Sequence, residues 1–216
     1  MDPVTDQALL FEALSDKVLH QLPPAVWKDL FLGEGRASIH FEQRQLTLVH
    51  ADAALQPDEG AAWAVFRQEL QRLAARYQGR LDPYVHATAL VAFEDPSAAV
   101  RMAMALQRAA TGLGLRVGVV SGRCALAFFR TQGRLWCTPL GAQPHRAAEV
   151  TAGAALGGIL ISPETYGPVQ GQHQGDRMGE AAFTPDFQDS ELDLSTLAYA
   201  AAPAPVPGAR RFARHA

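Results

Sequence analysis

The sequence has few cysteines, no long apolar run and no excess of basic charge. Its two cysteines, Cys124 and Cys137, are too few for a disulfide framework or a cysteine-rich metal cluster, so they indicate free thiols in a reducing compartment. No apolar stretch approaches the roughly 20 residues that span a bilayer. A formal net charge of −3 lacks the basic surface of a nucleic-acid-binding protein. We therefore expect a cytoplasmic protein without nucleic acid or membrane insertion.

The composition is that of an ordinary soluble protein. The chain has 216 residues, of which 48% are hydrophobic and 19% charged, which suffices for one domain with a buried core. We expect three regions. Residues 1–40 form an N-terminal helical segment, residues 41–202 form the main domain, and residues 203–216 form a tail rich in Pro, Ala and Arg. The prolines of that tail predict disorder.

The N-terminal segment carries a helical pattern. Leu10, Leu14 and Val18 are four residues apart, which predicts an amphipathic helix over residues 5–21 with one apolar stripe. Two prolines then end this helix and begin a short second one. Packing or helix pairing is the expected use of the stripe, because its polar face has no basic excess for a membrane surface.

The main domain alternates strand and helix patterns. Strands are expected at 45–52, 80–93 (a hairpin bent near 86–88), 115–120, 123–129, 135–138, 159–162 and 194–200, and helices at 57–77, 96–110 and 142–152. Gly79 is the expected stop of the first of these helices, and Ser121-Gly122 is the expected turn between two strands. Residues 167–190, rich in Gly, Gln and Asp, predict a mobile loop. The order favours an α/β (α+β) ferredoxin-like sandwich.

Five segments resemble the catalytic domain of class III adenylate and guanylate cyclases in order, spacing and character. They are QLTLVHAD (45–52), YVHATALVAF (84–93), LRVGVVSG (115–122), TPLGAQPHRAAE (138–149) and GILIS (158–162). The resemblance implies the ferredoxin-like core of that family. It also implies that the N-terminal helix, with its Leu-Pro-Pro step, leads signals into the domain and takes part in a dimer.

Two carboxylates hold the catalytic metals in that family. The first lies in a Phe-x-Asp-Ile pattern, and here the matching run His50-Ala-Asp-Ala53 gives Asp52 as the metal ligand that persists. The second lies in a Gly-Asp turn, which reads His86-Ala87 here. Alanine supplies no oxygen for a divalent cation.

The positions that select the purine base are half retained. The family lysine lies three residues before the Gly-Asp turn, where this chain has Pro83. The second position, usually Asp or Thr, matches Thr138, three residues ahead of Gly141. The resemblance therefore implies Thr138 as a base contact.

The ribose and phosphate positions differ from the family pattern. Val-Asn-x-Ala-Ala-Arg is replaced by Pro144-His-Arg-Ala-Ala-Glu149. His145 stands at the Asn position, and Glu149, at the Arg position, would repel a triphosphate. Arg146 lies about 100° away around the helix and is no direct substitute.

These substitutions predict a catalytically inactive cyclase homology domain, bacterial and cytoplasmic, that acts as a signalling and dimerisation module without a cofactor. Two other functions stay open: a sensor that binds a nucleotide or cyclic nucleotide without turnover, and weak residual cyclase activity with Mn²⁺. A different metal site formed by His50, Asp52, His86 and His145 is a further alternative. The opposing interpretation is that these histidines are scattered and bind no metal.

Overall fold

The computed structural model describes residues 3–54, 60–85, 88–110, 113–178 and 198–199. Its strands are β1 (His40–Asp52), β2 (Arg80–Leu81), β3 (Ala89–Phe93), β4 (Arg116–Thr131), β5 (Arg134–Leu140), β6 (Ile159–Ile161) and β7 (Ala198–Tyr199). Its helices are α1 (Pro3–Leu19), α2 (Pro24–Leu32), the 3₁₀ helix η1 (Glu34–Ser38), α3 (Gly60–Arg76), α4 (Pro96–Ala109), α5 (Ala142–Gly153) and α6 (Pro163–Met178). The strands form one sheet in the order β2-β3-β1-β4-β6-β7, and β5 pairs with β4 outside this path.

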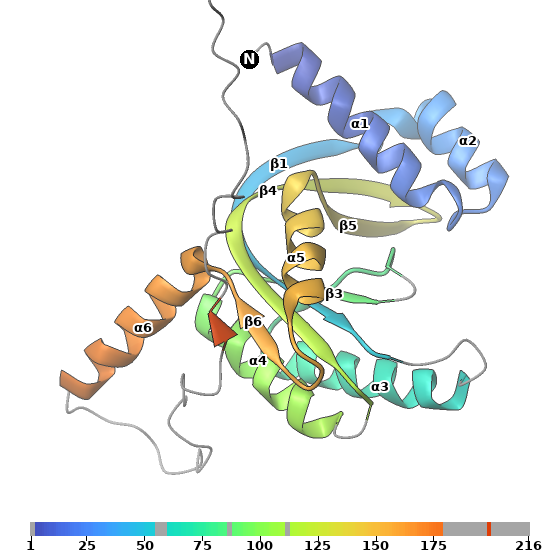
Figure 1. The fold of residues 1–216 in the computed structure, drawn as a ribbon. Helices are drawn as coiled ribbons and strands as arrows, with labels where there is room; N and C mark the ends of the chain where they lie inside the picture. The colour runs from blue at the N-terminus through green and yellow to red at the C-terminus, as the bar shows by residue number, and fades with distance from the viewer. Residues whose placement is uncertain (1–2, 55–59, 86–87, 111–112, 179–197, 200–216) are drawn as a thin grey trace, which may run out of the picture.

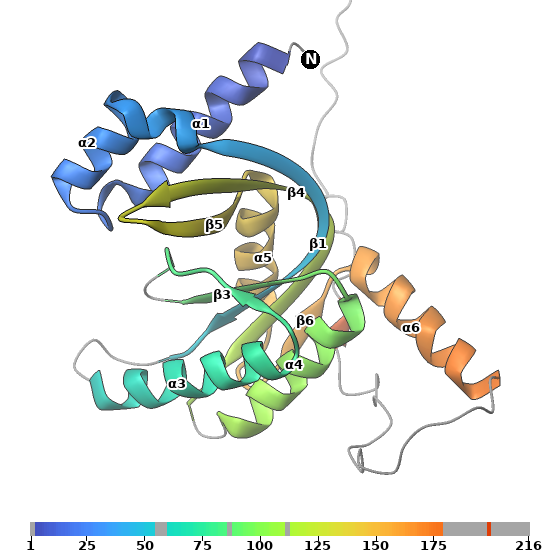
Figure 2. The ribbon, with the colours of Figure 1, turned by 180° about the vertical axis from the view of Figure 1, so that it is seen from behind.

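The fold is the mixed α/β fold that the sequence predicted, and helices cover both faces of its sheet. α5 crosses one face in Figure 1, and α3 and α4 lie on the other, seen from behind in Figure 2. Successive side chains of a strand point to opposite faces. Val49 and Ala51 of β1 accordingly pack with α3 and α4, whereas Leu46 and Leu48 pack in a second cluster with Ala147 of α5.

The long strands β1 and β4 continue beyond this sandwich, and there the N-terminal helices cover them (Figure 1). We call the β4–β5 hairpin from Arg123 to Leu140 the arm. A third cluster joins α1 and α2 to the arm, and its fully or nearly buried members are Leu14, Val18, Leu30, Phe31, Tyr84, Ala125, Ala127, Phe129 and Leu140. The predicted stripe of α1 thus packs on the sheet of its own chain.

Local signals positioned several helix ends correctly. Asp95 caps α4, accepting hydrogen bonds from the backbone N–H groups of Ser97 and Ala98. The end of α3 differs from the prediction, because Gln78, with φ of 61°, takes the left-handed conformation. Gly79 follows it and donates its N–H to the carbonyl of Ala74. A Cβ on Gly79 would lie 2.4 Å from the Phe93 ring, so close packing explains this glycine.

Two predicted boundaries are wrong. Ser121-Gly122 is no turn: both residues lie inside the continuous strand β4, each opposite a β1 residue. The helix α6 (Pro163–Met178) includes residues 167–178, the first half of the segment in which a mobile loop was expected. Residues 179–190, the 86–87 bend and the 203–216 tail lie outside the described residues. No helix in the described ranges is long and apolar enough to cross a membrane.

Candidate functional site

Asp52, the predicted metal ligand, ends β1 directly opposite Arg116 at the start of β4. Its side chain is half-buried. The Nε atom of Arg116 is buried without a hydrogen-bond partner. The strand pairing therefore brings a carboxylate and a guanidinium to the same edge of the sheet, a juxtaposition that the sequence comparison did not predict.

His50, two residues before Asp52, is buried between α5 and the start of β3. Its Nδ1 lies 2.9 Å from Thr151 Oγ1, and its Nε2 lies 3.0 Å from Thr88 Oγ1. Burial lowers the pKa of His50, and the negative charge of Asp52 opposes that shift. His50 is therefore a neutral residue that links two elements, with no free nitrogen for a metal.

The proposed alternative metal site does not form within the described residues. His145 is exposed on α5, both nitrogens of His50 already have hydroxyl partners, and His86 lies outside the described ranges. Across those ranges, no three His, Cys, Asp or Glu side chains are placed to share a metal ion. Ala87, at the second carboxylate position, also lies outside the described part of the chain.

Thr138, the predicted base contact, is fully buried. Its hydroxyl lies 3.0 Å from each carboxylate oxygen of Asp82 and donates to that group. The Lys17 ammonium, reaching in from α1, donates to Asp82 Oδ2 at 2.6 Å and to the Pro139 carbonyl at 2.9 Å. The backbone N–H of Tyr84 donates to Asp82 Oδ1 at 3.0 Å. Thr138 is therefore part of a closed polar cluster.

We call Lys17, Asp82 and Thr138 the Lys17 cluster. The Asp82 side chain is 1% exposed and that of Lys17 is 18% exposed. Such a buried carboxylate requires a cation and hydrogen-bond donors, because its desolvation is otherwise costly. Asp82 has three kinds of donor: the ammonium of Lys17, the hydroxyl of Thr138 and, from outside the cluster, the backbone N–H of Tyr84.

Sequence reasoning missed Lys17 and Asp82. A signal existed for each: Lys17 is three residues after Leu14 and lies on the apolar side of its helix, and Asp82 precedes Pro83 in a turn. Pro83, identified as the lost lysine position, directly follows Asp82. An ammonium thus reaches the neighbourhood of position 83 from a different element.

His145 and Glu149 lie one turn apart on α5, and both are exposed. α5 packs on the sheet through Ala147 and Thr151, which are buried. A Cβ at Gly118 of β4 would lie 2.5 Å from Thr151 Oγ1 and 2.6 Å from the Thr151 backbone N. The glycine therefore permits the close approach that fixes α5. Arg146 is held by Glu164, with its Nη2 2.8 Å from Oε2.

The sequence matches no protein-family model. It also matches no curated protein. Among the solved structures with the same fold are nucleotide cyclases, at 14–23% identity. The adenylyl cyclase CyaB from P. aeruginosa is 23% identical, with a TM-score of 0.53 over 61% of this chain and 83% of that one.

Two further structures extend this comparison. The catalytic core of a rhodopsin-guanylyl cyclase with converted specificity, in complex with ATPαS, is 14% identical, with a TM-score of 0.54 over 62% of this chain and 85% of that one. The guanylate cyclase domain of RhGC from Catenaria anguillulae, in complex with GTP, is 15% identical, with a TM-score of 0.52 over 60% and 85%.

This comparison contradicts the prediction that the chain is not an enzyme, because these three structures, which share its fold, are adenylyl and guanylyl cyclases. The prediction equated four substituted positions with lost chemistry. That inference is weak in physical terms, since groups from other elements enter the same region, as Lys17 does beside Pro83. The described residues thus give the chain the fold of an adenylyl and guanylyl cyclase catalytic domain.

Proposed function

We propose that the chain is a cyclase-fold signalling module that acts through protein contacts, with residues 1–40 as the segment that brings the signal to the domain. The observation that carries this proposal is the Lys17 cluster, which joins α1 to β5 and to the β2–β3 connection. Because of these hydrogen bonds, a displacement of α1 changes the contacts of Asp82 and Thr138. The N-terminal segment is therefore coupled to the sheet by specific contacts.

The proposal includes a homodimer formed through the N-terminal helices and the arm. Three large apolar side chains on these elements are more than half exposed: Leu9 at 59%, Leu32 at 74% and Leu135 at 57%. They offer an apolar surface to a second copy. A guanylyl cyclase domain from Blastocladiella emersonii with this fold, 14% identical and with a TM-score of 0.53, is described as dimeric.

Sedimentation velocity at tens of micromolar tests the dimer. We expect the wild-type chain to sediment as a dimer and Leu32→Glu to sediment as a monomer, because a charge at the interface must be desolvated. Val65→Glu is the matched control, since Val65 is a similarly exposed apolar residue (68%) on α3, remote from the N-terminal helices. A wild-type chain that is strictly monomeric at this concentration contradicts the proposal.

Nucleotide cyclisation is a second candidate function, favoured by the cyclases that share the fold and by Asp52 at the end of β1. Asp52 is the residue that would hold a metal, although no group of three potential ligand side chains within the described ranges completes a site around it. For this reason we derive no reaction step through a metal.

An assay of the full chain with Mn²⁺ and either ATP or GTP tests this second function. Cyclic product that disappears in Asp52→Ala would support it, and product that persists in that variant would indicate a contaminating enzyme. Thermal shifts with the same nucleotides distinguish a sensor, because a ligand that binds the folded state raises the unfolding temperature even without turnover. If the assay gives no cyclic product and the nucleotides give no thermal shift, both nucleotide functions are excluded and the protein-contact function stands.

A further inference from the structure

We propose that α1 is a latch, held closed by the Lys17 ammonium over Asp82 and Thr138, and that it opens as a unit separately from the rest of the fold. This inference rests on the proposed role of residues 1–40 as the segment that carries a signal. It goes further in naming the bond that must break, the helix that moves and the groups that the movement uncovers.

The closed state is specified by one ion pair with good geometry. Lys17 spans from α1 to Asp82 Oδ2 and to the carbonyl of Pro139. One turn beyond Lys17, Gln21 Nε2 donates to the carbonyl of Tyr84 at 2.9 Å. Among the described residues, the polar attachment of α1 to the sheet therefore lies at its C-terminal end and just beyond it, on the two segments that contain Asp82 and Thr138.

The apolar attachment of α1 is narrow. Only Leu14 and Val18 are fully buried among its described side chains, whereas Leu10 and Phe11 are half-buried and Leu9 is exposed. By contrast, α4 buries six of its residues, among them Val100, Met102 and Leu106. Elements with few buried apolar contacts open at lower free energy than the core, so α1 is expected to open before α4.

The chemistry of the ion pair makes the latch sensitive to Lys17. Asp82 is nearly inaccessible, and Lys17 is its one cationic partner within the described residues. Removing the ammonium leaves a buried carboxylate with only a hydroxyl and an N–H group, and breaking a buried pair is far more costly than replacing both partners. Hydration of Asp82 in the open state relieves that cost, so loss of Lys17 favours opening.

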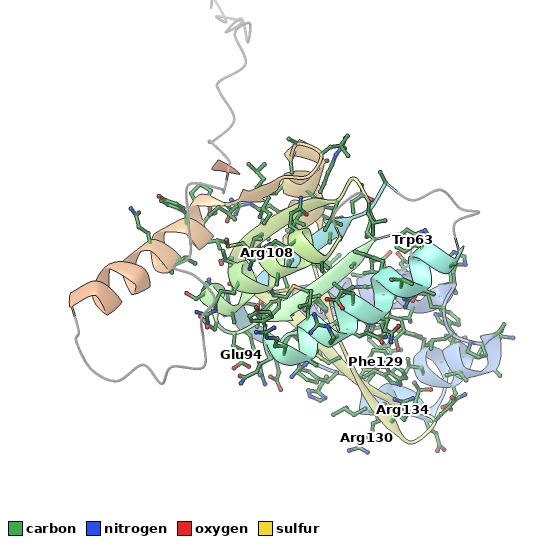
Figure 3. The ribbon with its side chains drawn as sticks, turned by 90° about the horizontal axis from the view of Figure 1, so that it is seen from below. Trp63, Glu94, Arg108, Phe129, Arg130 and Arg134 are labelled. Carbon is green, nitrogen blue, oxygen red and sulfur yellow. The ribbon has the colours of Figure 1, made fainter. Side chains whose placement is uncertain are left out.

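Opening uncovers both polar and aromatic groups. On the sheet side, the Tyr84 ring contacts the rings of both Phe129 and Trp136, with ring centroids 5.8 Å apart in each pair. Phe11 of α1 covers part of this surface, and Trp27 and Phe31 of α2 cover the rest. Figure 3 shows Phe129 on the arm beside these helices, with Arg130 and Arg134 at the outer end of the hairpin. The latch therefore controls access to the part of this aromatic surface that α1 covers, and to Asp82 and Thr138.

Hydrogen–deuterium exchange of the full chain tests the latch. In the wild type, we expect the α1 amides to exchange faster than the most protected amides of α4, because α1 opens without global unfolding. In Lys17→Met, α1 exchange should accelerate by roughly tenfold to a hundredfold while α4 exchange stays the same. Equal protection of α1 and α4 in the wild type would overturn the proposal, whatever the variants do.

Two controls separate the latch from a general loss of stability. Lys28→Met removes an exposed lysine of α2 and should leave α1 exchange unchanged. Lys17→Met combined with Asp82→Asn should restore most of the protection, since no charge is then left buried. If amide exchange accelerated equally in α1 and α4 of Lys17→Met, the Lys17–Asp82 ion pair would stabilise the whole domain. That result would refute the latch. A monomer whose α1 opens separately would refute the proposed dimer and leave the latch intact.

Discussion

The imidazole of His50 on β1 is joined to the hydroxyl of Thr151 on α5, with Nδ1 2.9 Å from Oγ1. Thr151 Oγ1 also lies 2.7 Å from the Ala147 carbonyl, to which it donates. The hydroxyl has one proton, so Nδ1 of His50 must carry the hydrogen of the bond between them. Nε2 then accepts from Thr88, and every polar atom of the neutral ring has a partner.

We expect the stability of the fold to fall on acidification through His50. Burial lowers its pKa below the ordinary value of 6.5, so the unfolded chain binds a proton there before the folded chain does. The stabilising effect of neutral His50 is present above about pH 6.5 and is lost as the pH falls through the lower folded pKa. Urea unfolding at about pH 7.5 and 5.5 measures the difference.

His50→Gln is the control for this prediction. Glutamine is neutral at every pH and can both donate and accept, so the variant should lose less stability over the same pH interval than the wild type. An identical pH dependence in the two proteins would assign the effect to other titrating groups and would contradict the burial argument.

Gly118→Ala should destabilise the contact between α5 and β4. The new Cβ would lie 2.6 Å from the backbone N of Thr151 and 2.8 Å from the Ala147 carbonyl, and backbone atoms cannot rotate away. We expect a loss of about 1–3 kcal/mol in the free energy of unfolding, as for overpacking of a core. Denaturant titration measures it.

Gly122→Ala is the matched comparison on the same strand. Its Cβ would meet the end of the flexible Gln143 side chain, at 2.3 Å from Nε2, and that side chain can move. The loss should be clearly smaller than for Gly118→Ala. Equal losses would mean that α5 is displaced in both variants and that the Thr151 contact has no special weight.

Thr138→Val should destabilise the chain, because Asp82 would lose a hydrogen-bond donor within a buried site. We expect a cost of about 1–3 kcal/mol. Thr138→Ser retains the hydroxyl and should recover most of it. Calorimetric unfolding of the three proteins decides the order, and a valine variant as stable as the serine variant would mean that Asp82 is satisfied without Thr138.

The elements that the sequence predicted well are those whose signals are local. Asp95 capped α4 as expected, and the apolar stripe of α1 proved to be a packing face. Ser121-Gly122 misled because glycine also occurs inside strands where a side chain approaches closely. Here Gln143 of α5 packs over Gly122, and no local pattern reveals that contact.

The candidate site was less predictable, because its central contact links residues that are distant in sequence. Lys17 and Asp82 are 65 positions apart, and the amphipathic pattern of α1 does not say which surface it covers. Comparison with the cyclase motifs, position by position, identified Thr138 and Pro83. It did not identify the Lys17 ammonium, which lies close to both in the fold. Side chains from another element become visible only in three dimensions.

The two thiols should differ in reactivity. Burial raises the pKa of Cys124 to about 11, and its side chain is 1% exposed. Burial also raises the pKa of Cys137, but Arg80 Nη1, 3.4 Å from its sulfur, opposes the shift. Because the thiolate is the reactive form, we expect Cys137 to be alkylated slowly at about pH 8 and Cys124 to be protected.

Mass spectrometry of the native chain after alkylation at about pH 8 should therefore find one label per chain, and two after denaturation. Cys137→Ser should take up none in the native state on the same time scale. A label on Cys124 in the native protein would mean that β4 and its neighbours open well below the free energy of global unfolding. That result would also weaken the latch, which requires α1 to open separately from the rest of the fold.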